Sequence, residues 1–460
     1  MPTARLRRRR SQRGQAIVLG LCLLMIGALV VLLQFSAGQA VAAKSRLVNA
    51  TDAAAYSTGV WRARAMNYYA YTNRAIVANE VAIAQAATMV SYAKYLERLT
   101  DNVNDVAQYV PYVGEISEAL KEIAYWISEL TQSTATLEVP LRSAHIAALV
   151  ASQHAMFVAT HPVVLSRIAA EVARENDRRF FAFTMPTSLD PSFGDFTRVW
   201  KDDDRGRLRD VVLRSLDGFS SRRDAQLPID LPCMPVLARR GATELVRDHE
   251  AGFERWQAYD TLSLHAPGFL CRRREVLPLG WGAAEIAVDP KHELDALGTG
   301  GVGMSVGDVP GSVAGSTAGD AGKRDNPRAY GNASDEIWSS GSYRGIAAVR
   351  EIDFDSPAVV AAKGRFPTLK VAVVGRIQDP AAVATAQAAG HGRGRIQPQD
   401  RFAGRAPAVM AAVSVAEVYF RRPPQSNERT EYASLYSPYW QVRLAEVPDA
   451  LRVAAAGYLR

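Results

Sequence analysis

The longest apolar run of the chain lies near its beginning. Residues 16–33 include no charged or strongly polar side chain, and apolar character continues through Phe35 and Ala37. At about 1.5 Å per residue, a helix of this length covers the roughly 30 Å hydrocarbon core of a bilayer. We therefore predict a transmembrane helix over residues 16–38, preceded by a basic leader over residues 1–15.

The charges that flank the apolar run predict its orientation. Six arginines precede it, namely Arg5, Arg7, Arg8, Arg9, Arg10 and Arg13, whereas only Lys44 and Arg46 follow closely. Basic residues favour the cytoplasmic side, so the sequence predicts a single-pass membrane protein whose N-terminus is cytoplasmic and whose bulk lies on the opposite side of the membrane. The competing interpretation is a secretory signal cleaved after Ala42. Signal cores of about 7 to 15 residues are shorter than this run, which favours a retained anchor.

A long helix is predicted to follow the anchor as part of a helical stalk over residues 39–185. No glycine or proline lies between Gly59 and Pro111, so this stretch is typical of one very long helix or of two helices almost end to end. One stripe recurs every seven residues, at Leu47, Ala54, Trp61, Tyr68, Ala75, Ala82, Met89, Leu96, Val103 and Val110. A second row of small or weakly polar residues, which allows another helix to approach closely, comprises Thr58, Ala65, Thr72, Asn79, Ala86 and Ala93. The pattern favours packing within the chain over an intermolecular seam.

Two further helical segments are predicted over residues 115–137 and 141–179, separated near Pro140 and bent near Pro162. Apolar residues of the first segment share helical spacing, which predicts a buried face made of Ile116, Leu120, Ile123, Ile127 and Leu130. With the preceding helix these segments fit an antiparallel bundle.

The sequence after residue 185 predicts a mixture of helices and strands. Residues 186–290 are punctuated by prolines and predict an irregular α+β region, and residues 291–335, rich in Gly and Ser, predict a flexible loop. The part from 336 to 460 is predicted to be β-rich, with one antiparallel sheet formed by strands at 283–288, 343–354, 369–377, 408–420 and 439–447 and an exposed excursion over 380–404. The fold class is therefore α+β: a transmembrane helix that continues into a helical stalk, then a mixed periplasmic domain with an antiparallel sheet.

The charge balance argues against one class of function, and the cysteines indicate the compartment. The formal net charge is +7, and removing the six leader arginines leaves +7 − 6 = +1 for the rest. This argues against nucleic-acid binding. Cys22 lies within the anchor, whereas Cys233 and Cys271 form a pair that an oxidising compartment would bridge; two separate buried thiols are the alternative.

No pattern of catalytic or ligand-binding residues stands out. The glycines at 298, 300 and 303 match a dinucleotide motif by letter, but the strand before it and the helix after it are not predicted. His145, His154 and His161 lack a carboxylate placed to complete a zinc site, and Asp202–Asp203–Asp204 is typical of a solvated turn. We expect no enzymatic activity, no cofactor, no metal and no small-molecule substrate.

The segment around the anchor resembles the TadE/TadG-like family of Flp (Tad) pilus-assembly proteins, in particular its long TadG-like members. The residues that match are Arg13 and Gly14 before the span, with Gln15 and Ala16 entering it, and then Arg46, Leu47, Asn49, Ala50, Asp52, Ala53, Ala54 and Ala55. If the leader is processed as in prepilins, the cut lies between Gly14 and Gln15, although Leu19 stands where processed pseudopilins carry Glu.

The resemblance implies a non-enzymatic, membrane-anchored component of a Tad/Flp-type pilus or a related secretion apparatus. Its expected partners are the inner membrane and other proteins of the apparatus, contacted through helix packing. Two alternatives remain: an exported structural or adhesive surface protein released by signal peptidase, and an envelope enzyme whose site is assembled from distant residues.

Overall fold

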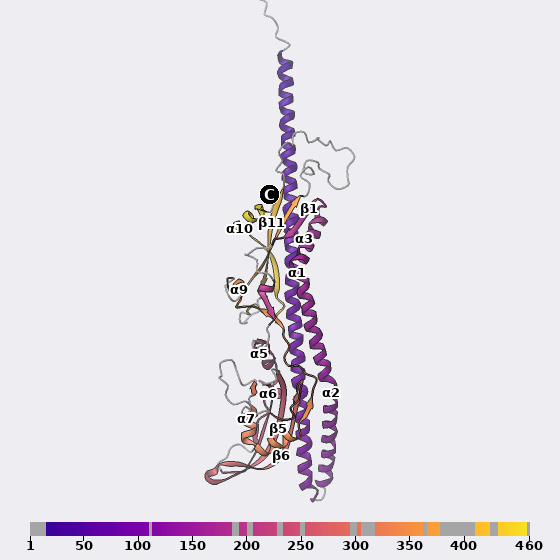
Figure 1. The fold of residues 1–460 in the computed structure, drawn as a ribbon, viewed down its shortest axis with the longest axis vertical. Helices are drawn as coiled ribbons and strands as arrows, with labels where there is room; N and C mark the ends of the chain where they lie inside the picture. Colours follow the sequence, from indigo (N-terminus) through magenta and orange to yellow (C-terminus); the bar gives the residue numbers. More distant parts are fainter. Residues whose placement is uncertain are drawn as a thin grey trace, which may run out of the picture.

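A single helix runs through nearly the whole length of the molecule, and two sheets lie along it one after the other (Figure 1). The computed structural model describes residues 15–109, 113–185, 193–199, 206–227, 233–248, 254–294, 301–304, 318–361, 366–377, 410–423 and 431–457. Their fold is mixed α+β with antiparallel sheets, as the sequence predicts. The three long helices precede the sheets along the sequence, as predicted, but in space the sheets lie beside the long helix rather than beyond its end.

The three main helices are α1 (Gln15–Ala107), α2 (Val113–Ala159) and α3 (Pro162–Asn176). The predicted break near Pro140 is wrong, since α2 continues through it, held to the body of the protein on both sides by buried Ala135 and Ile146. The break at Pro162 is confirmed. Proline there is the first residue of α3, where its missing N–H costs nothing, and the His161 side chain accepts a hydrogen bond from the Val163 amide.

The first sheet lies next to the exposed N-terminal part of α1. It is antiparallel, and its order is β1 (Phe180–Thr184), β10 (Leu369–Ile377), β11 (Ala411–Phe420) and β12 (Trp440–Ala445). Small residues of α1 that follow its exposed segment, together with α3, pack on the inner face of this sheet: Ala50, Ala54 and Ala169 share a core with Val371 and Val373. Nearly two hundred residues separate β1 from β10 in the sequence, so the second sheet belongs to an insertion.

The second sheet covers the distal half of α1. Its order is β3 (Ala225–Leu227), β4 (Val236–Asp248), β5 (Glu254–Pro267), β6 (Arg273–Ile286) and β8 (Trp338–Ser340), with β7 (Gly301–Met304) paired to β4. All pairs are antiparallel except β6 with β8. This long sheet corrects the expectation of an irregular region over 186–290.

Shorter elements complete the fold. The helices are α4 (Phe193–Phe196), α5 (Gly206–Arg214), α6 (Gly218–Ser221), α7 (Ala318–Asp325), α8 (Pro327–Asp335), α9 (Pro357–Ala361) and α10 (Asp449–Gly457), with a 3-10 turn at η2 (Phe269–Cys271). A two-stranded ribbon joins β2 (Thr197–Val199) to β9 (Arg350–Ile352).

The predicted single sheet of the C-terminal part is wrong. The strands expected at 369–377, 408–420 and 439–447 do pair, but the one expected at 283–288 is the end of β6 in the other sheet, and 343–354 contributes only β9. Residues 318–335 of the expected loop form α7 and α8, because Tyr330 and Ala333 find an apolar surface at Tyr259 to cover. The expected excursion over 380–404 lies outside the described residues.

Buried ion pairs account for the charged residues inside the second sheet. Three arginine–carboxylate pairs have both side chains almost fully buried: Arg209 with Glu254, Arg223 with Asp260, and Arg255 with Glu285. Burial of a charge is tolerated only when a partner of opposite sign and further hydrogen bonds replace water. Asp260 also accepts a hydrogen bond from Ser91 of α1, so this polar centre ties the sheet to the long helix.

The small-residue row of α1 faces α2 over much of its length. All six members are buried, and polar pairs bridge the two helices: Gln153 donates to Thr72 over 2.8 Å, and Arg142 to Asn79 over 3.4 Å. The row that starts at Leu47 behaves differently, since Leu47 and Ala54 are buried whereas Met89 and Val103 are each 49% exposed.

The predicted buried face of α2 is wrong. Ile116, Leu120, Ile123, Ile127 and Leu130 are exposed, whereas the residues turned inward are Ser117, Ala124, Ser128, Ala135, Val139, Ile146 and Gln153. Close approach of α2 to the small-residue row needs small side chains on both helices. The sheets cover the opposite side of α1. The larger apolar side chains of α2 do not fit the close contact between the two helices, and they point away from α1.

Candidate membrane anchor and assembly segment

The first turns of α1 stand clear of the rest of the protein (Figure 1). The large apolar side chains between Ile17 and Phe35 are 43–70% exposed, with no packing partner for them among the described residues. Among those residues, α1 is the one unbroken helix that is long and apolar enough to cross a membrane. A soluble protein rarely exposes an apolar surface of this extent, so this segment is a candidate anchor.

The helix passes from the exposed segment into the folded body without a break. Ala43 is the first residue described as buried, followed by Leu47. Between them, Lys44 donates a hydrogen bond to the carbonyl of Ala411 at the start of β11. The first sheet therefore begins within two turns of the apolar segment, and any movement of that segment is coupled to the sheet.

The family-like segment over 46–55 is largely used inside the protein. Leu47, Ala50, Ala54 and Ala55 are buried against α3 and the first sheet, whereas Asn49 and Arg46 are exposed. Its small residues permit the sheet to lie close to the helix, and the Asp52 carboxylate accepts a hydrogen bond from Ser414 of β11. Ala53 is half-buried. The structure thus assigns this alanine-rich stretch to the core of the first sheet, and it leaves Arg46 and Asn49 as its outward surface.

Glycines in the first sheet show how close this contact is. A side chain at Gly375 of β10 would collide with Thr51, and a Cβ at Gly59 of α1 would lie 2.5 Å from Val442 of β12. At these positions a side chain of one element therefore packs directly on the glycine backbone of the other. Gly14 lies outside the described residues, and Gln15 is the first residue of α1.

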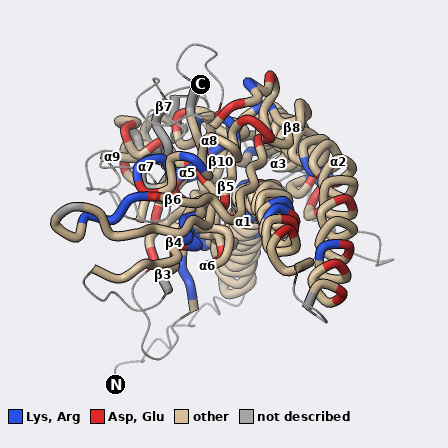
Figure 2. Tube along the Cα trace, turned by 90° about the horizontal axis from the view of Figure 1, so that it is seen from below, with Lys and Arg blue, Asp and Glu red and all other residues tan. Residues whose placement is uncertain are grey.

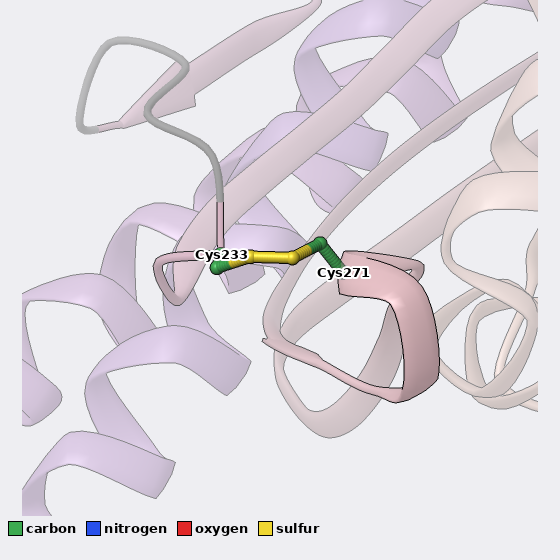
Figure 3. The surroundings of a disulfide bond; sticks show 2 residues. All are labelled: Cys233 and Cys271. Carbon is green, nitrogen blue, oxygen red and sulfur yellow. A yellow bond between two sulfur atoms is a disulfide. The ribbon is translucent and has the colours of Figure 1, made fainter.

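Cys233 and Cys271 form a disulfide (Figure 3). It joins the segment that leads into β4 to the turn between β5 and β6, near the distal end of the second sheet. Both cysteines are exposed, whereas Cys22 is a free cysteine on the exposed apolar part of α1. The bridge limits the opening of the β4–β5–β6 meander at one edge.

The histidines considered from the sequence do not come together as a metal site. His145 and His154 are exposed on α2, and His161 caps α3. Within the described ranges no three His, Cys, Asp or Glu side chains are grouped to hold a metal ion. Residues 301–304 of the glycine motif form β7 rather than a helix start. Asp202–Asp203–Asp204 lies outside the described residues.

The most perturbed carboxyl group among the described residues is enclosed in the core. Glu80 of α1 is fully buried and accepts a hydrogen bond of 2.8 Å from the Tyr343 hydroxyl. Burial raises the pKa of Glu80 to about 7, with nearby Glu254 acting in the same direction, while the hydrogen bond from Tyr343 opposes the rise. This group has no solvent access through which a substrate would reach it.

One open depression contains polar side chains. It has a volume of about 690 Å³ and lies between α1 and the segment around β12, where Arg74, Arg422, Glu431 and Tyr436 contribute to its lining. Arg422 pairs with Glu431 over 2.9 Å. Among the described residues that line the depression, Glu431 is the one carboxylate, and none of them forms a nucleophile–base pair of the kind that covalent catalysis requires.

Comparison with known proteins gives no match: no family model, no curated protein and no solved structure matches this chain.

Proposed function

We propose that this chain is a non-enzymatic, membrane-anchored component of a Tad/Flp-type pilus or a related secretion apparatus. The observation that carries the proposal is the continuity of α1, in which an exposed apolar segment of spanning length leads directly into the helix that both sheets pack on. The resemblance at residues 46–55 supplies the assignment to this class of apparatus. The arginines of the leader favour a cytoplasmic N-terminus and a periplasmic body.

Retention of the anchor is supported by the helix itself. Signal peptidase would have to cut after Ala42, inside α1 and next to buried Ala43. In the retained form, α1 tethers the folded body to the membrane. Contacts with other proteins of the apparatus are then made by the exposed surfaces, which are the apolar segment within the bilayer and the outer face of the periplasmic body.

The test compares three forms of the protein produced at equal abundance in a pilus-forming host. The first is the native chain, and the second has residues 16–38 replaced by an unrelated spanning helix. The third carries a cleavable signal directly before Val41, so that the body is released. We expect carbonate-resistant membrane association of the first two forms and loss of pili with the third.

The anchor swap separates two roles. Loss of pili with the swapped helix assigns a specific lateral contact to residues 16–38, and normal pili assign them to tethering alone. Normal pili with the released body would overturn the proposal, as would a mature native protein whose first residue, by mass spectrometry, is Ala43.

A further inference from the structure

The outer face of α2 presents seven large apolar side chains to solvent. These residues, called the α2 stripe below, are Ile116, Leu120, Ile123, Ile127, Leu130, Leu137 and Leu141, and their exposed fractions lie between 46% and 76%. α2 packs on α1 through its other side, so the α2 stripe is the free face of the helical pair. A contiguous apolar surface of this kind marks an interaction site.

The spacing of the α2 stripe predicts what it binds. The intervals from Ile116 to Leu130 alternate between four and three residues, and Leu137 and Leu141 continue the register, with exposed Thr134 at the one polar position. Apolar residues with this alternating spacing are typical of the contact line between two packed helices. It extends over about 38 Å at 1.5 Å per residue, which matches a partner helix of nearly four heptads.

The negative charge near the α2 stripe favours a basic partner helix over an acidic one. Residues 113–142, which carry the α2 stripe, include five acidic residues, one lysine and one arginine, giving 2 − 5 = −3. Acidic positions recur along α2 (Figure 2). Glu115, Glu122 and Glu129 lie seven residues apart, each directly before a residue of the α2 stripe and therefore about 100° around the helix from it, and no salt bridge involves them within the described part of the chain. A second copy would bring like charges together, whereas a basic helix would neutralise them.

Lipid is not a suitable occupant of this face. Arg142, at the end of the α2 stripe nearest the anchor, contacts Asn79 of α1. Asn79 follows Phe35 by 44 residues, which places it about 66 Å further along the helix. The remaining stripe extends away from the anchor, and acidic side chains are repelled by anionic headgroups.

We propose that the α2 stripe is the docking surface for a cationic amphipathic helix of another protein. Its apolar residues pack between those of the stripe, and its Lys or Arg side chains pair with Glu115, Glu122 and Glu129. The proposal does not depend on the assignment to a pilus, because it follows from the surface of α2 alone.

The test uses the full chain in nanodiscs of zwitterionic lipid and measures the binding of fluorescent peptides by anisotropy. The probe is a peptide of about 28 residues, four heptads, with Leu in the seam and Lys at the flanking positions. A second peptide carries Glu in place of Lys, and empty nanodiscs give the background. We expect saturable binding of the Lys peptide, weakened by added salt, and none of the Glu peptide.

Variants then locate the site. A triple variant, Ile123→Ser with Ile127→Ser and Leu130→Ser, should weaken binding by at least about tenfold, and Glu122→Lys with Glu129→Lys should do the same. Val453→Ser, at an equally exposed apolar residue of α10, is the matched control and should bind as the native chain does. Circular dichroism confirms that each variant is folded.

Three outcomes overturn the proposal. The first is that the Lys peptide fails to bind the native chain, and the second is that the triple variant binds it as tightly as the native chain does. The third is that sedimentation shows a dimer of the native chain that the triple variant loses, because a second copy would then occupy the face.

Discussion

Ser91 of α1 donates a hydrogen bond of 2.9 Å to Asp260 of β5, at a point where both side chains are fully buried. The same carboxylate receives Arg223 over 2.8 Å. The long helix and the second sheet are therefore joined through one charged centre. If Asp260 loses its negative charge, the buried guanidinium of Arg223 loses the partner that neutralises it.

We predict that Asp260→Asn lowers the free energy of unfolding by about 3–5 kcal/mol, the range for a buried charge that loses its partner. The control is Arg222→Met, which breaks a neighbouring pair in which Arg222 is 56% exposed; its expected cost is below about 1 kcal/mol. Denaturant unfolding in detergent, followed by circular dichroism, measures both. Equal costs for the two variants would contradict the prediction.

Glu80 is predicted to make stability fall as pH rises. Burial raises its pKa from 4.5 to about 7 in the folded protein, so between these pH values the folded state holds a proton that the unfolded state releases. The stabilising contribution is complete below pH 4.5 and is lost as pH rises through 7. Glu80→Gln keeps an acceptor for Tyr343 and removes the ionisation.

The free energy of unfolding of Glu80→Gln, relative to the native chain, should therefore be higher at pH 8 than at pH 4.5. Unfolding curves across this pH range test the slope, with Glu115→Gln, an exposed residue of α2, as the control. If the stabilities of the native chain and of Glu80→Gln run parallel from pH 4.5 to 8, the effect is ruled out.

Gly282 sets the distance between β6 and α1. A Cβ at this position would lie 2.5 Å from the backbone nitrogen of Tyr95, and backbone cannot rotate aside as a side chain does. We predict that Gly282→Ala destabilises the protein by about 1–3 kcal/mol. Gly331→Ala is the control, because its Cβ meets nothing within 4 Å in α8; alanine there should stabilise by about 0.5–1 kcal/mol. Thermal unfolding that ranks the two variants in the reverse order would refute this account.

The folded body should be independent of the apolar segment. A chain that starts at Val41 retains every residue of the first-sheet core, and we predict that it is monodisperse without detergent and melts within a few degrees of the native chain. A chain that starts at Val60 lacks Leu47, Ala50 and Ala54.

Because burial of one leucine side chain contributes about 1.5–3 kcal/mol and total stability is about 5–15 kcal/mol, the shorter chain should lose the cooperative unfolding of the first sheet. Calorimetry compares the two chains. Aggregation of the chain from Val41 in plain buffer, or equal melting of both, would show that the core begins elsewhere.

The long helix could be predicted from sequence because nothing interrupts it. The absence of Gly and Pro between residues 59 and 111 and an apolar run of spanning length are local signals. The range of β10 was also predicted to the residue, since both of its faces are mostly buried and apolar residues fill it apart from Lys370, Gly375 and Arg376. The partners of the strands could not be predicted, because β1 and β10 pair across the inserted second sheet.

The faces of the helices were harder to assign. α2 has two rows with helical spacing, one apolar and one small, and hydrophobicity alone favoured the wrong one; the matching small row on α1 was the signal for the correct choice. The strands β4 and β5 were missed because Arg239, Arg240 and Asp260 interrupt their apolar pattern. The position of the exposed apolar segment could be predicted from the sequence. The packing of Ala50 and Ala54 against a sheet could not, because it depends on residues more than 300 positions away.

The single helix that links the apolar segment to the far turn of the molecule acts as a lever. From Phe35 to Asn104 it is about 100 Å long, and the packed sheets and α2 stiffen most of that length. Spanning helices adopt tilts from 0° to about 40°. A change of about 10° in the tilt of α1 within a bilayer would move its opposite end sideways by about 17 Å. A small rearrangement of neighbouring helices in the membrane would therefore displace a partner bound at that end by a large distance.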